Sequence, residues 1–222
     1  MKLLHRISAL LFPPKCVLCQ KLLEKQETDL CHSCRTEISD FEKSKRSIPF
    51  LESWTALWYY SGSVRKSLLR FKFGNRRSYA QVYGRLLAMK LLREYPDGFD
   101  ILTWTPISRL RRLRRGYDQV ELLAQAVGSE LGVEPIPTLV KVRNNPPQST
   151  IHGFAQRKAN VLGAYRPVDP DRFRGKRVLL LDDIITSGAT VSEAARVLLT
   201  AGANEVVCAA VAAASHEQKK SQ

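Results

Sequence analysis

The stretch that decides the fold is Val178-Leu-Leu-Leu-Asp-Asp-Ile-Ile-Thr-Ser-Gly-Ala-Thr190. Its aliphatic residues do not alternate with polar ones, which predicts a strand over 177–181 that is buried on both faces of a parallel sheet. Two aspartates end this strand, and a loop of small residues then leads directly into a helix expected over 190–200. Thr190 and Glu193 have the spacing of a capping box, which places the start of that helix near Thr190.

The turn between this strand and this helix has the features of an anion site. Backbone N–H groups and hydroxyls gather there at a helix N-terminus, and Gly188 permits close approach of an anion to the backbone. Asp182 and Asp183 stand at the carboxyl end of the strand, where open α/β sheets bind their ligands. Two carboxylates suit the vicinal hydroxyls of a sugar, or a metal ion that bridges a sugar and a pyrophosphate. The alternative is a capped turn with two surface aspartates. The chain has neither G-x-x-x-x-G-K-[ST] nor G-x-G-x-x-G.

The rest of the sequence alternates between strand and helix patterns. Strands are expected over 53–60, 101–105, 139–142 and 205–211, and helices over 64–71, 79–92, 118–131 and 154–162. Segment 109–116 is expected to be a basic loop. This alternation predicts an α/β fold in which helices flank a parallel sheet.

Four of the five cysteines form two C-x-x-C pairs, Cys16 with Cys19 and Cys31 with Cys34. Two such pairs in tandem predict a tetrahedral zinc site, because each two-residue spacer lets both thiolates reach one ion. Four protein ligands leave no open position for water, so the zinc is expected to be structural. Two redox dithiols or two disulfides are the alternatives. Cys208 lies in an apolar run and is expected to be a buried hydrophobic residue.

The net charge of the 222-residue chain is +14, which favours phosphate-rich partners and makes such binding sensitive to salt. Five arginines are clustered: Arg109, Arg111, Arg112, Arg114 and Arg115. They are expected to bind a pyrophosphate, to bind a nucleic-acid backbone, or to form a solvated charged loop. A second basic set is interleaved with aromatic residues, which suits single-stranded nucleic acid but equally a helix with its aromatics in the core. It comprises Arg65, Lys66, Arg70, Lys72, Arg76 and Arg77, with Phe71, Phe73 and Tyr79.

The composition divides the chain into three segments. Residues 1–48 are expected to hold an N-terminal helix, the four-cysteine zinc module and a linker, residues 49–215 the α/β domain, and residues 216–222 a polar tail. No run approaches the roughly 20 apolar residues that span a membrane. The N-terminus lacks the pattern of a cleavable signal peptide, so the protein is expected in the cytoplasm, where structural disulfides are rare.

Segment 179–190 resembles the phosphoribosyl pyrophosphate (PRPP) signature of type I phosphoribosyltransferases. Nearly the whole chain is similar to the ComF family, also called the ComFC/GntX group. Besides the cysteine pairs, this resemblance is carried by Leu11-Phe-Pro-Pro14, Tyr60-Ser-Gly62, Leu69-Arg-Phe-Lys-Phe-Gly74, Arg114-Arg-Gly-Tyr-Asp-Gln119, Pro147-Gln148 and Arg157-Lys-Ala-Asn160. Tyr117 and Asp118 depart mildly from the family's R-R-G-F-N-Q, and Ile151-His-Gly-Phe154 departs from a segment that usually bears leucine.

The resemblance implies roles for the residues of the signature. Asp182 and Asp183 would hold the ribose 2′- and 3′-hydroxyls, with Mg²⁺ accompanying the pyrophosphate of PRPP. The 5′-phosphate would be wrapped by Thr186, Ser187, Gly188, Ala189 and Thr190. Gln148, Arg157 and Asn160 would line or brace the pocket.

The resemblance also implies a function. A ComF-type protein would bind PRPP and act in natural transformation, handling incoming single-stranded DNA alongside the uptake helicase and recombination proteins. The PRPP segment alternatively implies a Mg²⁺-dependent phosphoribosyltransferase that acts on an unidentified acceptor. A third hypothesis is that PRPP or a nucleotide is only a ligand that orders the basic loop. At the level of sequence these hypotheses stay open, including whether the chain turns over PRPP.

Overall fold

The computed structural model describes residues 13–42, 46–146 and 154–215. The expected N-terminal helix, part of the linker, the polar tail, Gln148 and most of segment 151–154 lie outside the described residues. Within the described part, no helix is long and apolar enough to span a membrane.

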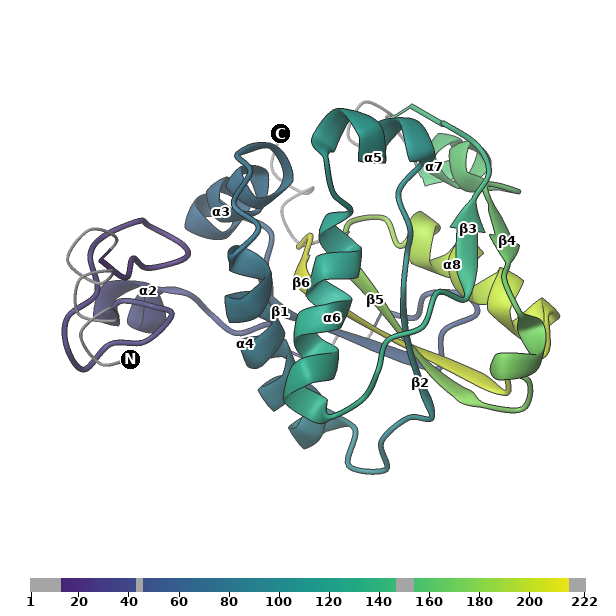
Figure 1. Ribbon diagram of the computed structural model, residues 1–222, viewed down its shortest axis with the longest axis horizontal. Helices are drawn as coiled ribbons and strands as arrows, with labels where there is room; N and C mark the ends of the chain where they lie inside the picture. The colour runs from purple at the N-terminus through teal and green to yellow at the C-terminus, as the bar shows by residue number, and fades with distance from the viewer. Residues whose placement is uncertain (1–12, 43–45, 147–153, 216–222) are drawn as a thin grey trace.

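A four-stranded parallel sheet forms the centre of the molecule (Figure 1). Its strands are β1 (Ser53–Tyr59), β6 (Glu205–Ala213), β5 (Arg177–Ile185) and β2 (Ile101–Trp104), in that order across the sheet. All three neighbouring pairs are parallel. The predicted parallel sheet with covering helices is therefore confirmed.

One face of the sheet is covered by helices α3 (Gly62–Phe73), α4 (Tyr79–Glu94) and α6 (Gln119–Leu131), with α4 and α6 side by side (Figure 1). Leu179 and Leu181 of β5 point into the apolar core on this face. The intervening strand residues point to the opposite core, since successive side chains of a strand alternate between its two faces. A strand buried on both faces has no polar stripe, which is why its sequence is continuously aliphatic.

The opposite face is covered by α8 (Ala189–Thr200), which packs on β5 and β6. Helix α7 (Phe154–Val161) and a short 3-10 helix, η2 (Pro170–Arg172), belong to the same half of the chain. Strand β3 (Leu139–Lys141) lies outside the parallel sheet and pairs antiparallel with β4 (Tyr165–Pro167), a strand that the sequence patterns did not indicate.

The structure corrects two expectations around the signature segment. Strand β5 continues through both aspartates to Ile185, four residues beyond the predicted end. Helix α8 begins at Ala189, and its N-cap residue is Gly188 with φ of +79°. The expected capping box is absent from this described helix start. Glu193 instead accepts a hydrogen bond from the Gly163 N–H at 2.8 Å and pairs with Arg196.

The expected basic loop is a helix, α5 (Arg109–Arg115). The side chain of Ser108 caps its start by accepting a hydrogen bond from the Arg111 N–H. Gly116 ends it with φ of +78°, a left-handed conformation that favours glycine. The prediction was wrong because charge density was taken as a loop signal, although arginine and leucine are both good helix formers.

Candidate functional site

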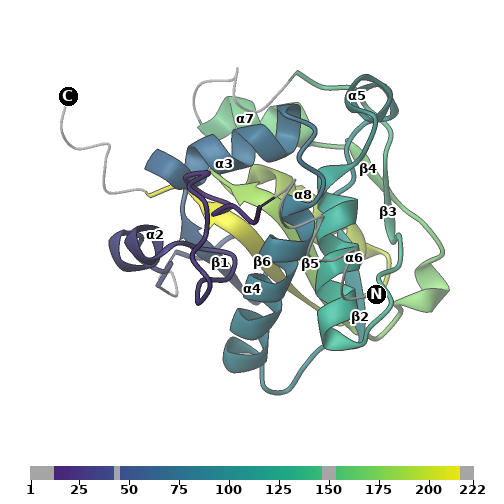
Figure 2. The same ribbon diagram turned by 60° about the vertical axis from the view of Figure 1, so that its left-hand side comes forward.

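A cavity of about 600 Å³ opens at the carboxyl ends of β5 and β2. Asp182, Asp183, Thr186 and Thr190 line it, so the signature segment faces an open space as predicted. Helices α3, α5 and α7 lie together at this end of the molecule in both ribbon views (Figures 1 and 2).

The two aspartates lie in the wall of the cavity and are only 7% and 4% exposed. Asp183 accepts a hydrogen bond from Gln119 Nε2 at 2.7 Å through one oxygen and pairs with Lys72 Nζ at 2.9 Å through the other. Asp182 accepts the Asp183 N–H at 2.8 Å and a hydrogen bond from the Thr105 hydroxyl. Burial, together with the charge of Asp183, raises the pKa of Asp182 to about 7.

These carboxylates do not fit a divalent cation. Mg²⁺ requires near-octahedral oxygen ligands and keeps several of its waters. Both oxygens of Asp183 are already engaged by protein donors, and one of those donors is an ammonium group. Burial also favours the neutral form of Asp182, which is a poor metal ligand.

The loop that follows β5 shapes the side of the cavity. Thr186 and Thr190 line the cavity, while Gly188 packs against the linker. Its φ of +79° favours glycine, and a Cβ there would lie 2.9 Å from Ile48 and 2.8 Å from the Arg46 guanidinium. Arg46 also donates a hydrogen bond to the Thr186 carbonyl at 3.1 Å. The Ala189 N–H donates to the Ser187 hydroxyl at 3.4 Å, whereas the N–H groups of Thr190 and Val191 have no carbonyl within their own helix and are available to an anion.

The structure separates the five clustered arginines. Arg111, Arg114 and Arg115 line the main cavity. Arg109 lines a smaller hollow of about 340 Å³ beside β3, and Arg112 pairs with Glu121 at 3.0 Å. Three of the five therefore share the space with the acid pair, because α5 presents one side to the cavity.

The second basic set divides in the same way. Phe71 and Tyr79 are buried, and Arg70 donates hydrogen bonds to the carbonyls of Val17 and Leu18, so these three stabilise the fold. Phe73 is 71% exposed and lines the cavity, with the Arg115 guanidinium 5.0 Å from its ring centroid.

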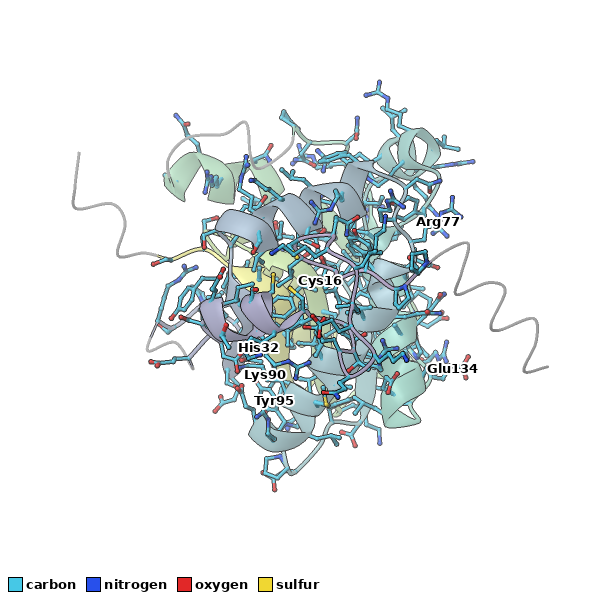
Figure 3. All side chains as sticks on the ribbon, turned by 90° about the vertical axis from the view of Figure 1, so that its left-hand side faces the viewer. Cys16, His32, Arg77, Lys90, Tyr95 and Glu134 are labelled. Carbon is cyan, nitrogen blue, oxygen red and sulfur yellow. The ribbon has the colours of Figure 1, made fainter. Side chains whose placement is uncertain are left out.

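A second arginine–aromatic pair lies nearby, where Arg77 stands over the ring of Tyr117 at 4.9 Å. Figure 3 labels Arg77 at the edge of the molecule. Phe73, Arg77, Arg115 and Tyr117 form what we call the cavity mouth, which joins the two basic sets that the sequence kept apart.

The four paired cysteines converge as predicted. The sulfur atoms of Cys16, Cys19, Cys31 and Cys34 all lie within 4.8 Å of one another, and those of Cys19 and Cys31 are 3.5 Å apart. Tetrahedral zinc at about 2.3 Å from each sulfur requires sulfur–sulfur distances of about 3.8 Å, so the cluster fits this ion. All five cysteines are free thiols, which disfavours the disulfide alternative, and Cys208 is buried as expected.

The zinc module is docked on the helices of the larger part. Figure 2 shows the N-terminal segment lying across α3 and α4, and Cys16, labelled in Figure 3, belongs to the core beneath them. Gln20 Nε2 donates to the Tyr79 hydroxyl at 2.6 Å, and Asp29 pairs with Arg85. The short helix α2 (His32–Glu37), which the sequence did not indicate, carries Cys34.

Comparison with known proteins assigns both parts of the chain. A double zinc ribbon domain matches residues 7–45, and a phosphoribosyl transferase domain matches residues 116–222. The chain is 24% identical to Competence protein F of Haemophilus influenzae over 86% of this chain and 93% of that protein. It is 25% identical to Competence protein ComFC of Bacillus subtilis over 84% and 78%, respectively. The chain belongs to the ComF family.

A third relative has a different name. The chain is 32% identical to the DNA utilization protein YhgH of Salmonella typhi, over 62% of this chain and 61% of that protein. The zinc ribbon and phosphoribosyltransferase assignments agree with the folded cysteine cluster and with the sheet that carries the acid pair.

Sequence reasoning missed several residues that line the cavity of this ComF-family chain. Lys141 ends β3, Tyr165 begins β4, and the Lys141 ammonium lies 5.1 Å from the Tyr165 ring centroid. Burial, assisted by the charge of Arg111, lowers the pKa of Lys141 to about 8. The rule that located the aspartates, ligands at strand ends, would have found Lys141 had it been applied to 139–142.

The family-derived positions Arg157 and Asn160 have different roles. Arg157 lines the cavity. Asn160 Nδ2 donates to the Pro146 carbonyl at 3.2 Å, so this residue braces the loop before α7.

Proposed function

We propose that this ComF-family protein binds PRPP in the cavity and acts in natural transformation. The observation that carries the proposal is the convergence, around one space of about 600 Å³, of an acid pair, the first turn of α8 and a group of cationic side chains. Sugar hydroxyls, a phosphate and a pyrophosphate are the groups that these three features recognise, respectively. The relatives named as competence proteins support the cellular role.

The 5′-phosphate would be held by the loop from Thr186 to Thr190. Thr186 and Thr190 would bring hydroxyls, while Ser187, Gly188 and Ala189 would contribute the turn and its backbone N–H groups. Asp182 and Asp183 would accept ribose hydroxyls, because a carboxylate has about four lone-pair sites and only some are in use here. The pyrophosphate would lie against Arg111, Arg114 and Arg115. Any Mg²⁺ that accompanies PRPP would then be held by ligand oxygens.

The test of this site is a calorimetric titration of PRPP into the wild-type protein and the Asp182→Asn plus Asp183→Asn variant. We expect the double variant to lose detectable binding, since both hydroxyl acceptors are weakened and Lys72 loses its carboxylate. A matched double change at the exposed residues, Asp169→Asn plus Asp171→Asn, should bind as the wild type does. Normal binding by the Asp182 and Asp183 variant would show that the site is wrongly placed.

A role in handling single-stranded DNA is proposed for the cavity mouth. Exposed Phe73 with Arg115 supplies an aromatic face beside a cation, the combination on which a base stacks while phosphates are neutralised, and Arg77, over the buried ring of Tyr117, adds a second cation. The name of the YhgH relative points toward DNA as well. The helicase and recombination partners stay a proposal that depends on this DNA role.

The DNA role is tested by fluorescence anisotropy with a labelled oligonucleotide at several salt concentrations. Phe73→Ala plus Arg115→Gln should weaken binding about tenfold and lower the slope of log K against log salt by about 0.7, the single-strand value for one phosphate contact. The control is Leu92→Ala plus Arg93→Gln, which changes an exposed apolar residue and an exposed arginine on α4. An equal loss in both variants would argue for nonspecific attraction by net charge alone.

A transferase activity is the second candidate, favoured by two titratable groups with shifted pKa values. Asp182, with its pKa raised to about 7, and Lys141, with its pKa lowered to about 8, line the same cavity, and such shifts are typical of functional sites. Incubation with PRPP, Mg²⁺ and a panel of nucleobases and amines, followed by an assay for released pyrophosphate, tests it. Release with one acceptor supports transfer, whereas binding without any release supports a role as a ligand sensor.

A further inference from the structure

Lys72 lies beside Asp183 in the wall of the cavity. Its ammonium pairs with Asp183 Oδ1 at 2.9 Å, and both side chains are largely withdrawn from solvent. Lys72 lies in the last turn of α3, which is anchored by the fully buried Leu68 and Phe71. The Tyr117 hydroxyl donates a hydrogen bond to the Phe71 carbonyl, which fixes the same turn. The last turn of α3, held by these contacts, therefore positions the Lys72 ammonium beside Asp183.

The side chains that line the cavity carry more positive than negative charge. Among the described residues, six cationic side chains line it: Lys72, Arg111, Arg114, Arg115, Lys141 and Arg157. In the part of the chain that the structure describes, two carboxylates line the same cavity, those of Asp182 and Asp183. PRPP contains a phosphate monoester and a pyrophosphate and so carries about five negative charges near neutral pH. The surplus is about four positive charges when both carboxylates are ionised and about five when Asp182 is neutral, which nearly balances such a ligand without any added cation.

We propose that Lys72 is a built-in counter-cation, and that this cavity binds a sugar pyrophosphate without a divalent metal ion. The inference deepens the proposed PRPP site and rests on it. Lys72 neutralises Asp183, so the acid pair can accept ribose hydroxyls without repelling the phosphates of the same ligand. The remaining cations then meet the pyrophosphate, which in a less basic cavity would require a metal for neutralisation.

The ion pair is compatible with hydroxyl recognition. Lys72 and Gln119 take one lone-pair site on each oxygen of Asp183, and a carboxylate offers about four. A hydroxyl needs one such site, whereas an octahedral cation needs an oxygen without a competing positive charge next to it. The same geometry that disfavours the metal therefore leaves the sugar site open.

The experiment is a calorimetric titration of PRPP into the zinc-loaded protein, in buffers freed of metal with a chelating resin and again with added Mg²⁺. The resin is removed before the titration, so that structural zinc stays on the protein. We expect the dissociation constants in the two buffers to agree within about threefold. Lys72→Met should weaken binding at least about tenfold in the metal-free buffer, and added Mg²⁺ should recover part of this loss.

Two further variants control for folding and for charge. Lys72→Arg keeps a cation on α3 and should retain binding without Mg²⁺, which excludes a general packing defect at this position. Lys66→Met removes an exposed lysine from the same helix and should leave binding unchanged.

The possible outcomes separate this inference from the proposed function. Wild-type binding that appears only with Mg²⁺ would overturn the role of Lys72 and leave the PRPP site standing. Undiminished metal-free binding by Lys72→Met would do the same. A wild-type protein that binds PRPP in neither buffer would overturn the site itself together with the inference.

Discussion

The zinc module and the cavity both use helix α3, but they use its polar side chains in opposite ways. On the module side, Ser67 and Arg70 donate hydrogen bonds to backbone carbonyls between Cys16 and Cys19. Each of these bonds joins α3 to the zinc module. On the cavity side, Lys72 forms an ion pair whose surroundings hold an excess of positive charge. The first arrangement is completed by contacts within the protein, whereas around the second the described cationic side chains outnumber the carboxylates.

This contrast separates a structural site from a binding site by physical criteria. The cysteine cluster has the four ligands that zinc requires, and it is packed within an apolar core. The cavity combines shifted pKa values, a turn at a helix start and cations in close proximity. Contacts within the protein complete the module, and an excess of cationic side chains among the described lining residues marks the cavity.

The largest expected effect comes from breaking the module. Cys34→Ser removes a zinc ligand and should lower the free energy of unfolding by at least about 3 kcal/mol, because metal affinity contributes directly to folding here. Denaturant unfolding together with measurement of bound zinc would test this. Cys208→Ala, at a buried thiol outside the cluster, should cost about 1 kcal/mol and leave the zinc content unchanged. A Cys34→Ser protein with full zinc and wild-type stability would contradict the structural assignment.

Sequence reasoning recovered the module and the centre of the cavity because both depend on local patterns. The cysteine spacing determines which thiols can meet, and the aliphatic run before Asp182 marks a strand that is buried on both faces. Charge runs were less informative, since α5 presents Arg111 to the cavity while Arg112 turns to Glu121. The 3.6-residue period of a helix tells which adjacent residues face different sides. Because segment 109–116 was predicted to be a loop, this period was not applied to it.

The contacts between distant segments could not be predicted. Lys72 meets Asp183, and Arg46 of the linker meets Thr186, across separations that no local pattern encodes. The same holds for the docking of the module, in which Gln20 reaches Tyr79. These contacts follow from the order of strands in the sheet, which brings segments far apart in the chain to the same edge.

An intermediate effect is expected at Arg46, which links the linker to the cavity loop. Arg46→Ala removes the hydrogen bond to the Thr186 carbonyl and the packing under Gly188, so the loop becomes less well ordered for phosphate. We expect PRPP binding to weaken about tenfold with little change in melting temperature.

Arg174 provides the matched control for Arg46, because it packs against Gly202 just beyond the other end of α8. Arg174→Ala should leave the affinity for PRPP unaltered. Equal affinities of the Arg46→Ala and wild-type proteins for PRPP would show that the linker contacts the loop after β5 without positioning it. Helix α3 would then be the structural connection between the zinc module and the cavity.

The smallest effect concerns the pH dependence of stability. Because the pKa of Asp182 is raised to about 7 by burial and by Asp183, the folded protein binds this proton more tightly than the unfolded chain does. The contribution of Asp182 to stability is therefore present at low pH and is lost as the pH rises toward and through 7. Asp182→Asn removes the cost of the buried charge, so its stability relative to wild type should rise by on the order of 1 kcal/mol between pH 5 and pH 8.

Urea unfolding of both proteins across that pH range measures this difference, with the exposed Asp171→Asn as the variant that should show none. Parallel curves would mean that Asp182 is ionised throughout and that its environment is more polar than the contacts with Thr105 and Asp183 indicate. If unfolding measured at lower pH then showed a wild-type advantage that is lost below about pH 4, Asp182 would be the carboxylate that the cations stabilise. Lys72 and the other cations would then neutralise both aspartates rather than Asp183 alone. More of the positive charge around the cavity would be balanced within the protein, as the polar groups of the zinc module are.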